Sequence, residues 1–414
     1  MDLIKKILFA CVLAIGASAT LPAATSEHSN AHDRDHEALA QFVNSKRTIT
    51  LSEKDDFMDI NGDIRVEHIS KTERIVPPVG EKYKKTRHLE NVKLNLGIGY
   101  KADGVKAYAK LFFANSAGIN PNIHSNEADD VNGLFGSGTA DRLCLKEAWI
   151  EKELYEYCGY NARLFLGRIG LDKKFESAVQ FGARFNGFLF EVDKKFEPSW
   201  KVYAKIGSFV VDQRVNHFAH VAEIGALDIM EYKVDLIYNF ITWNECSRNR
   251  AGTHHPEGFR FRNSQIYAAY NIPHVYYGFD GKFYGAFVYN HAARRNTLTP
   301  NSSQNKAGYV GFTASQGRKE GNLTMKVEYQ AVQAQAIPDA DANGIGNGNF
   351  QGHTFTDGSG LGEGNYHGFK VSSVYYILDC LVLESSYNQT KELKKSLGGK
   401  HDYRKFASEL IFQF

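Results

Sequence analysis

The stretch NVKLNLGIGYK, Asn91 to Lys101, decides the fold class of this chain. Apolar and aromatic side chains fall at every second position, namely Val92, Leu94, Leu96, Ile98 and Tyr100. Lysine, asparagine and glycine fill the positions between them. A period of two residues indicates a β-strand with one apolar and one polar face. A strand that crosses a bilayer at a tilt takes about 9–11 residues, which is the length of this stretch.

The same alternation recurs along the chain and predicts about sixteen strands. They are 57–69, 89–101, 105–114, 142–152, 162–169, 185–196, 200–211, 219–228, 232–243, 263–272, 278–292, 306–317, 323–336, 366–378, 381–392 and 402–414. Eighteen strands are the rival count, which would require one of the longer segments to be split. Segment boundaries of this kind are accurate to a few residues.

Composition agrees with a strand-rich chain. Among 414 residues there are 22 Tyr, 28 Phe and 37 Gly but only 9 Pro, which suits strands better than helices. Lys and Arg total 49 and Asp and Glu total 47, so the chain lacks the basic excess of a dedicated nucleic-acid-binding protein.

The connections between the predicted strands alternate between short and long. Short ones include 102–104, 197–199 and 379–380, and long ones include 70–88, 115–141 and 337–365. A β-sandwich has no reason to sort its loops in this way, whereas an outer-membrane barrel has short turns at one end and long loops at the other. About sixteen strands enclose a lumen too wide for side chains to fill, so the polar face is expected to line water and the apolar face to meet lipid.

The N-terminus has the pattern of a secretory signal. Lys5 and Lys6 precede an apolar run that ends near Ala19, and small residues suited to cleavage follow it. We therefore expect a signal peptide at 1–24, a periplasmic extension at 25–56 and the barrel at 57–414; a retained anchor helix is the alternative. No later apolar run reaches 18 residues, so a helical inner-membrane protein is excluded.

Three short signals carry a resemblance to a known family. The last strand alternates Phe406, Leu410, Phe412 and Phe414, with Ser408 breaking the series. DINGDIRVEHI (59–69) resembles the first strand of many porins, and ARLFLGRIGLDKKFESAVQFGARFNG (162–187) resembles their fifth strand and third long loop. From about Asp56 to Phe414 the chain thus resembles the general porins of Gram-negative outer membranes. The subfamily stays open, and the cysteines after the signal depart from the usual porin pattern.

The resemblance implies a passive diffusion channel for small hydrophilic solutes or ions in the bacterial outer membrane, with no catalysis and no cofactor. It also implies that the third long loop folds into the lumen as a constriction, with Gly167 and Arg168 at the end of the strand before it. The aromatic terminal strand would be read by the barrel-assembly machinery. Outer-membrane lipid and two identical subunits, in a homotrimer, complete the expected partners.

Selectivity in such a pore would come from charged side chains. Candidates on the loop are Asp172, Lys173, Lys174, Glu176 and Arg184. Candidates on the lumen face of the strands are Asp63, Arg65, Glu67, Lys93, Lys110, Arg168, Lys201 and Lys205. An acidic loop facing a basic wall would focus a transverse field; the alternative is that each charge is only a solvated lumen residue. The set favours anions weakly or has no preference, and charge reversal at Lys173 and Lys174 is predicted to shift the reversal potential.

Other clusters are weaker. His28, His32 and His36 have helical metal-ligand spacing, but a solvated tail is the simpler interpretation. Asp339, Asp341 and Asp357 could bind calcium, but a mobile external loop is favoured. Four cysteines follow the signal, Cys144, Cys158, Cys246 and Cys380, and their pairing cannot be read from the sequence. An adhesin or surface antigen that binds through its long loops, and a barrel enzyme, remain the alternative functions.

Overall fold

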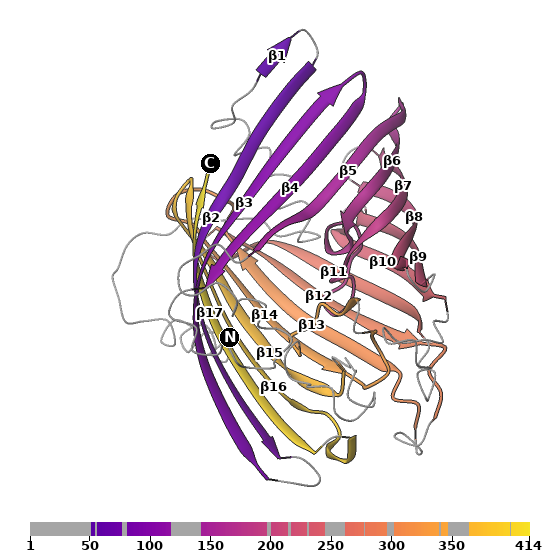
Figure 1. Ribbon diagram of the computed structural model, residues 1–414. Coiled ribbons are helices and arrows are strands. Elements are labelled where there is room, and N and C mark those ends of the chain that lie inside the picture. The colour runs from indigo at the N-terminus through magenta and orange to yellow at the C-terminus, as the bar shows by residue number, and fades with distance from the viewer. Residues whose placement is uncertain are drawn as a thin grey trace.

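The structure is a computed structural model (Figure 1). It describes residues 51–53, 56–76, 81–116, 142–196, 200–213, 217–229, 232–244, 261–276, 278–295, 302–338, 341–346, 364–397 and 399–414. Among these residues, no helix is long and apolar enough to cross a membrane.

Sixteen strands in the described part of the chain form one barrel. They are β2 (Asp56–Val76), β3 (Tyr83–Ala102), β4 (Val105–Ser116), β5 (Arg142–Tyr157), β6 (Tyr160–Gly170), β7 (Arg184–Phe196), β8 (Trp200–Asp212), β9 (His217–Ile229), β10 (Val234–Trp243), β11 (Arg262–Tyr276), β12 (Phe279–Asn290), β13 (Lys306–Ser315), β14 (Leu323–Val332), β15 (Tyr366–Leu378), β16 (Leu381–Glu392) and β17 (Lys400–Gln413). A three-residue strand, β1 (Leu51–Glu53), adds only a short pairing to the start of β2.

Every barrel strand pairs antiparallel with its neighbours in the sequence, and the sheet closes on itself. The closing pair is β17 with β2, which runs in register from Lys400 opposite Val76 to Gln413 opposite Asp63 (Figure 1). Closure leaves no free sheet edge, which is what a barrel in lipid requires. The predicted all-β antiparallel barrel and the count of sixteen are confirmed.

Each predicted strand segment corresponds to one observed strand. The largest difference lies in the first long connection, predicted at 70–88, where β2 continues to Val76 and β3 begins at Tyr83. Polar residues such as Thr72 and Thr86 stay in strand conformation because they pair with each other across the hairpin. The polar pattern predicts a loop here, whereas the structure extends both strands of the hairpin.

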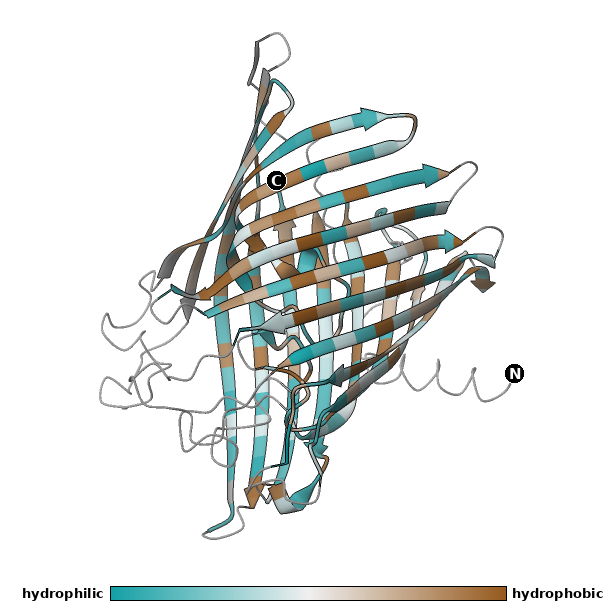
Figure 2. Ribbon diagram, turned by 90° about the vertical axis from the view of Figure 1, so that its right-hand side faces the viewer, coloured by the Kyte–Doolittle hydropathy of each residue, from teal (hydrophilic) through white to brown (hydrophobic). Residues whose placement is uncertain are grey.

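The two faces of the wall are inverted relative to a water-soluble barrel. Large apolar side chains on the outer face are strongly exposed, at 56% for Ile206, 59% for Ile224 and 62% for Ile266. Polar side chains such as Glu223 and Gln265 lie on the inner face and are buried. Figure 2 shows the resulting bands of hydrophilic and hydrophobic residues along the strands. An outer surface of this kind fits lipid better than water.

Several of the short connections are two-residue turns at one end of the barrel. Asp103 and Gly104 join β3 to β4, and Cys158 and Gly159 join β5 to β6. All four have positive φ, from 49° to 79°. Two central residues with positive φ match the right-handed twist of adjoining strands, which explains how these turns close so tightly.

Candidate functional site

The loop 171–183, between β6 and β7, folds into the barrel and packs on its inner wall. It opens with a short 3-10 helix, η2 (Leu171–Lys173). Its apolar side chains Leu171, Phe175, Val179 and Phe181 are almost wholly buried. Leu171, Phe175 and Phe181 pack with apolar residues that interrupt the polar inner face, chiefly Phe165, Leu189, Phe209 and Ile241. Val179 belongs to a second apolar cluster, together with Tyr267 and Tyr309. Burial of this apolar surface fixes the loop inside the lumen, as the resemblance implied.

Buried amide side chains on β10 and β11 fasten the same loop. Ser177 Oγ donates to Gln265 Oε1 at 2.7 Å. Gln180 Nε2 donates to Asn239 Oδ1 at 3.2 Å, and Asn263 Nδ2 donates to Gln180 Oε1 at 3.2 Å. Since Asn239, Gln265 and Asn263 are fully buried, each would be destabilising without its partner in the loop. The buried polar side chains of the wall therefore need the loop as their hydrogen-bond partner, and the same hydrogen bonds fix the position of the loop.

A second inward segment, residues 341–346, lies against the first loop. Gly182 N donates to Asp341 O at 3.0 Å, and Asn343 N donates to Val179 O at 3.0 Å. Ile345 N donates to Gln330 Oε1 at 2.9 Å, which ties the segment to β14. The interpretation of 337–365 as an external loop is therefore wrong for its described residues 341–346, because their backbone groups are satisfied inside the lumen.

Asp341 holds the two inward segments together. Its carboxyl group accepts a hydrogen bond from Ala183 N at 3.3 Å and is almost completely buried. Burial raises the pKa of Asp341 to about 7, against the lowering effect of backbone hydrogen bonds at Phe181 and Ala183. Among described residues no group of three or more His, Cys, Asp or Glu is arranged to hold a metal ion. Asp339 and Asp357, the other proposed calcium ligands, lie outside the described residues.

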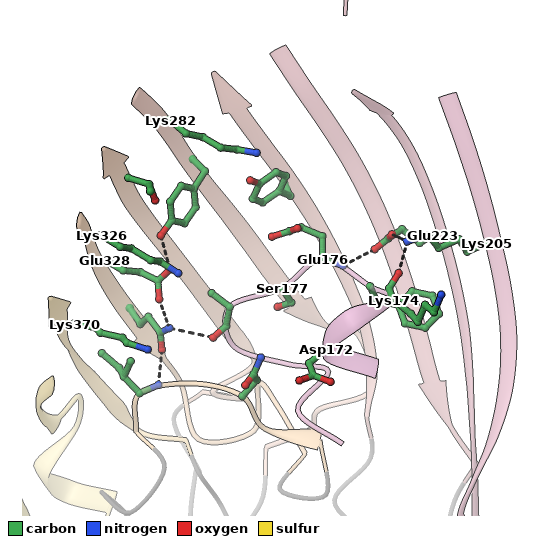
Figure 3. Close-up of a pocket in the computed structure, with 18 residues that line it drawn as sticks. Asp172, Lys174, Glu176, Ser177, Lys205, Glu223, Lys282, Lys326, Glu328 and Lys370 are labelled. Atoms are coloured by element: carbon green, nitrogen blue, oxygen red, sulfur yellow. Dashed lines mark hydrogen bonds and ion pairs between the residues drawn. The ribbon is translucent and has the colours of Figure 1, made fainter. Parts of the chain in front are cut away.

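A polar pocket of about 130 Å³ separates the first loop from the opposite wall. Lysines from the wall, Lys282, Lys326 and Lys370, reach into it from one side, and Glu176 enters from the loop (Figure 3). Three lysines at its edge have carboxylate partners: Lys205 with Glu223 at 3.3 Å, Lys282 with Asp235 at 2.9 Å and Lys326 with Glu328 at 3.0 Å. The loop contributes Asp172, Lys174 and Glu176 to the pocket, and the wall contributes four lysines together with two glutamates, so charges of both signs line it.

Glu176 is the loop carboxylate at the centre of this pocket. Its backbone N–H donates to Glu223 Oε2 at 2.9 Å. Burial within the lumen raises the pKa of Glu176 to about 7; the charge of Lys282 opposes this shift and the charge of Glu223 adds to it. The group therefore changes charge near neutral pH, at the point where the loop faces the wall.

The other predicted loop residues gather around Glu147 of β5. Lys173 Nζ lies 2.8 Å from Glu147 Oε1, and Arg184 Nε lies 3.6 Å from the same oxygen. Arg184 also contacts Asp172 Oδ2 at 3.5 Å. Lys174 reaches Glu191 at 3.6 Å and lines the pocket. Glu147 was not predicted, although its alternating position in β5 marked it as a lumen residue.

The predicted lumen residues of β2 and β3 form a second network beside the barrel closure. Lys93 Nζ contacts Glu67 Oε2 at 2.7 Å and Glu409 Oε1 at 3.3 Å. Arg65 pairs with Asp63 and, at 3.1 Å, with Glu409 Oε2. The structure therefore brings together all four predicted residues through Glu409 of β17. These charges are mutually satisfied, so they are weaker candidates for solute contact than the pocket lysines.

Arg168 is not brought to the loop. In the strand register it lies beside Ala148 and Asn186, on the same outer face as Leu166 and Phe188. Its guanidinium donates to Asn186 Oδ1 at 3.5 Å. Strand alternation is the physical reason, since the adjacent Gly167 and the buried Ile169 occupy the inner face of β6.

Of the remaining predicted lumen lysines, Lys201 pairs with Asp193 at 3.3 Å, and Lys110 lies opposite Glu147 in the register. The pocket residues that sequence reasoning passed over are Lys282, Lys326, Lys370, Glu223 and Glu328. All five occupy inward positions of alternating strands, and that signal was available. What the sequence does not reveal is which strands lie opposite the loop.

The terminal strand lies as expected. Phe406, Leu410 and Phe412 are exposed on the outer face, and Phe414 N donates to Gly62 O at 3.0 Å across the closure. Ile411, which breaks the polar inner pattern, packs inside against Tyr376 and Val382. Whether this strand is read by an assembly machinery stays a prediction.

Three cysteines are free in the structure: Cys144 and Cys158 are exposed and Cys380 is half-buried. Cys158 lies in the turn between β5 and β6, and Cys380 lies in the turn between β15 and β16. Cys246 lies outside the described residues, as do His28, His32 and His36.

No family model matches the chain, and no curated protein matches its sequence. Solved structures with a similar arrangement of strands include bacterial outer-membrane porins. OprB of Pseudomonas putida, in its high-pH structure, is 11% identical, with 86% of this chain and 94% of that chain covered and a TM-score of 0.48. OmpF of Salmonella typhi in complex with daunomycin is 11% identical, with 88% and 100% covered and a TM-score of 0.48. A triple mutant of the Rhodopseudomonas blastica porin is 11% identical, with 86% and 100% covered and a TM-score of 0.41. These similarities are to the barrel alone and do not define a solute or a subfamily.

Proposed function

We propose that this protein is an outer-membrane porin, a passive diffusion channel for small hydrophilic solutes or ions. The observation that carries the proposal is the inverted wall: apolar side chains face outward, and charged side chains line a lumen that an inward loop narrows. Because a closed barrel with this polarity is stable only around water and within lipid, conduction is its simplest use. No catalytic step and no cofactor are needed for it.

Solute flux into lipid vesicles tests the proposal. Vesicles that contain the refolded protein should swell in iso-osmotic solutions of small neutral sugars, at rates that fall steeply as the sugar grows. The loops narrow the lumen and thereby set the size limit. Empty vesicles and vesicles with heat-unfolded protein are the controls. Equal, slow swelling with all three preparations would exclude a diffusion channel.

We further propose that the barrel assembles with identical copies, as a homotrimer, through the outer face of β15 to β17. Three serines, Ser373, Ser385 and Ser408, form one row across these strands, between apolar residues above and below. Ser385 Oγ and Ser408 Oγ lie 3.1 Å apart. The row continues to His68, which contacts Glu90 of β3. Polar rows are disfavoured against lipid tails, so a protein partner is the better neighbour for this face.

A bulky residue in this row should separate the copies. Ser408→Trp is expected to lower the detergent-solubilised mass from the oligomer to the monomer, measured by analytical ultracentrifugation. Ile224→Trp, on the outer face of β9, is the matched control and should leave the mass unchanged. If the Ser408→Trp variant is still an oligomer, the interface between copies lies elsewhere on the barrel.

Export by a signal peptide at 1–24, insertion by the barrel-assembly machinery and residence in outer-membrane lipid belong to the same proposal. The exposed Phe406, Leu410 and Phe412 and the paired Phe414 support a role for the terminal strand in assembly. Phe414→Ala should reduce the amount of folded barrel in the outer membrane, measured by heat-modifiable mobility in gels. Normal yield would remove the terminal aromatic residue from that role.

A further inference from the structure

The inner wall beside the pocket carries a row of lysines that crosses the barrel closure. Lys370 of β15 lies opposite Asn388 of β16 in the register, Asn388 opposite Lys405 of β17, and Lys405 opposite Lys71 of β2. Neighbouring strands lie about 4.8 Å apart, so the three lysines span only about three strand spacings. We call these three residues the lysine row.

All three point into the lumen. Lys405 shares its face with the buried Tyr403 and Ala407, while Phe406 is 42% exposed on the outer face. Lys71 shares its face with the buried Ile69. Lys370 lines the pocket and extends toward it beside Lys326 (Figure 3). The row therefore continues the basic side of the pocket around the wall.

The lysine row differs from the rest of the pocket in lacking carboxylate partners. Among the lysines that line the pocket, Lys174, Lys205, Lys282 and Lys326 each have an acidic oxygen within 4 Å. No described carboxylate lies within 4 Å of Lys370, Lys405 or Lys71. At these three neighbouring positions a half-buried lysine therefore lacks the described carboxylate partner that usually balances its charge.

Like charges act on the row from several strands. Lys405 experiences the positive charges of Lys71, Lys370 and Lys93, and Lys370 experiences that of Lys326. The acidic groups that face them, Glu67, Glu328 and Glu384, act from beyond ion-pair distance. At about 0.1 M salt the screening length is about 10 Å, so the charges in the row reinforce one another. A concave wall of one sign concentrates counter-ions of the other sign.

We propose that Lys370, Lys405 and Lys71 form a binding station for multiply charged oxyanions, phosphate or carboxylate in kind, on their way through the pore. An ammonium group is a compact charge with three donors, which suits phosphate and carboxylate oxygens. A solute with several negative charges bridges two lysines of the row, whereas chloride pairs with one at a time. The station rests on the proposed channel function and gives that channel a solute class.

Block of single-channel current tests the station. The full-length refolded protein is inserted in a planar bilayer in KCl, and sodium tripolyphosphate or sodium citrate is added in separate experiments. The unmodified channel should show concentration-dependent block. Lys370→Gln should weaken the block roughly fivefold, and Lys370→Gln with Lys405→Gln roughly 25-fold, because one charge pair at contact in water contributes about a factor of five.

Lys391→Gln is the matched control. Lys391 is exposed in β16, on the outer face opposite to Asn388 and Thr390, so its loss should leave the block unchanged. Block by tripolyphosphate alone assigns the phosphate class, and block by citrate alone assigns the carboxylate class. A channel that conducts KCl but is blocked by neither anion, or whose block survives the double variant, overturns the station and leaves the proposed channel intact. Loss of KCl conductance in the unmodified protein would instead contradict the channel itself.

Discussion

Glu176 is the residue whose charge state matters most at the pocket. Its pKa of about 7, raised by burial, means that it is mostly neutral at pH 6 and mostly negative at pH 8. A negative charge beside Lys282 and Lys326 favours cations. We therefore expect the cation-to-anion permeability ratio to rise between pH 6 and pH 8, with a midpoint near 7, measured as the reversal potential in a KCl gradient.

Glu176→Gln is the test of that assignment. The variant keeps the size of the side chain and cannot titrate, so its permeability ratio should stay near the pH 6 value of the unmodified protein. An equal pH dependence in both proteins would show that another group titrates.

Lys173 and Lys174 lead to a second prediction at this scale. Replacing both with glutamate places negative charges beside Glu147 and Glu191, their present partners. The reversal potential should shift toward cation preference, and Lys174→Glu should account for most of the shift because only Lys174 lines the pocket. Equal shifts of the reversal potential from the two single variants would contradict the pocket as the place where ion selectivity is set. No shift in either variant would show that neither lysine contributes to selectivity.

The contact between the two inward segments is the element that shapes the lumen. Asp341 binds more protons in the folded protein than in the unfolded chain between its ordinary pKa of 3.8 and about 7. The contact therefore loses stability as pH rises through that window. Asp341→Asn cannot titrate, so its stability relative to the unmodified protein should improve from pH 4 to pH 8, by up to about 4 kcal/mol for a three-unit shift.

Hydrogen exchange measures this directly. The amides of Gly182 and Asn343 cross the contact, so their opening free energy reports its strength. The backbone N–H of Gln180 donates to Ser177 Oγ at 3.1 Å within the first loop and does not cross the contact, so its exchange serves as an internal reference. If the opening free energy of the Gly182 and Asn343 amides differs between the variant and the unmodified protein by the same amount at pH 4 and at pH 8, the role of Asp341 is contradicted.

The outer faces of the strands make a prediction about their surroundings. Ile206, 56% exposed, should face lipid. Ile206→Lys is then expected to destabilise the barrel by about 2–4 kcal/mol in urea titrations within lipid vesicles. Glu156→Lys, at an exposed position next to the β5–β6 turn, should be near neutral. A neutral Ile206→Lys would mean that this face does not contact lipid tails.

Strands could be predicted from the sequence because period-two alternation is a local property. Asn91 to Lys101 shows it within eleven residues, and the turns at Asp103 and Cys158 mark where it stops. The second inward segment could not be predicted, since a Gly-rich stretch has no period. The hydrogen bond from Ala183 to Asp341 joins residues 158 positions apart. Arg168 is the opposite case. The resemblance to the porin motif predicts a lumen position for it, whereas the alternation along β6 places it on the outer face.

The whole barrel combines a lipid-facing exterior with a charged interior, and conduction is the central claim that joins them. Single-channel recording in a planar lipid bilayer tests it most directly. The refolded full-length protein in 1 M KCl is expected to insert in discrete steps of equal conductance, with a linear current–voltage relation at low voltage. Protein that is folded by circular dichroism and inserted in the bilayer, yet gives no stepwise conductance, would contradict the account.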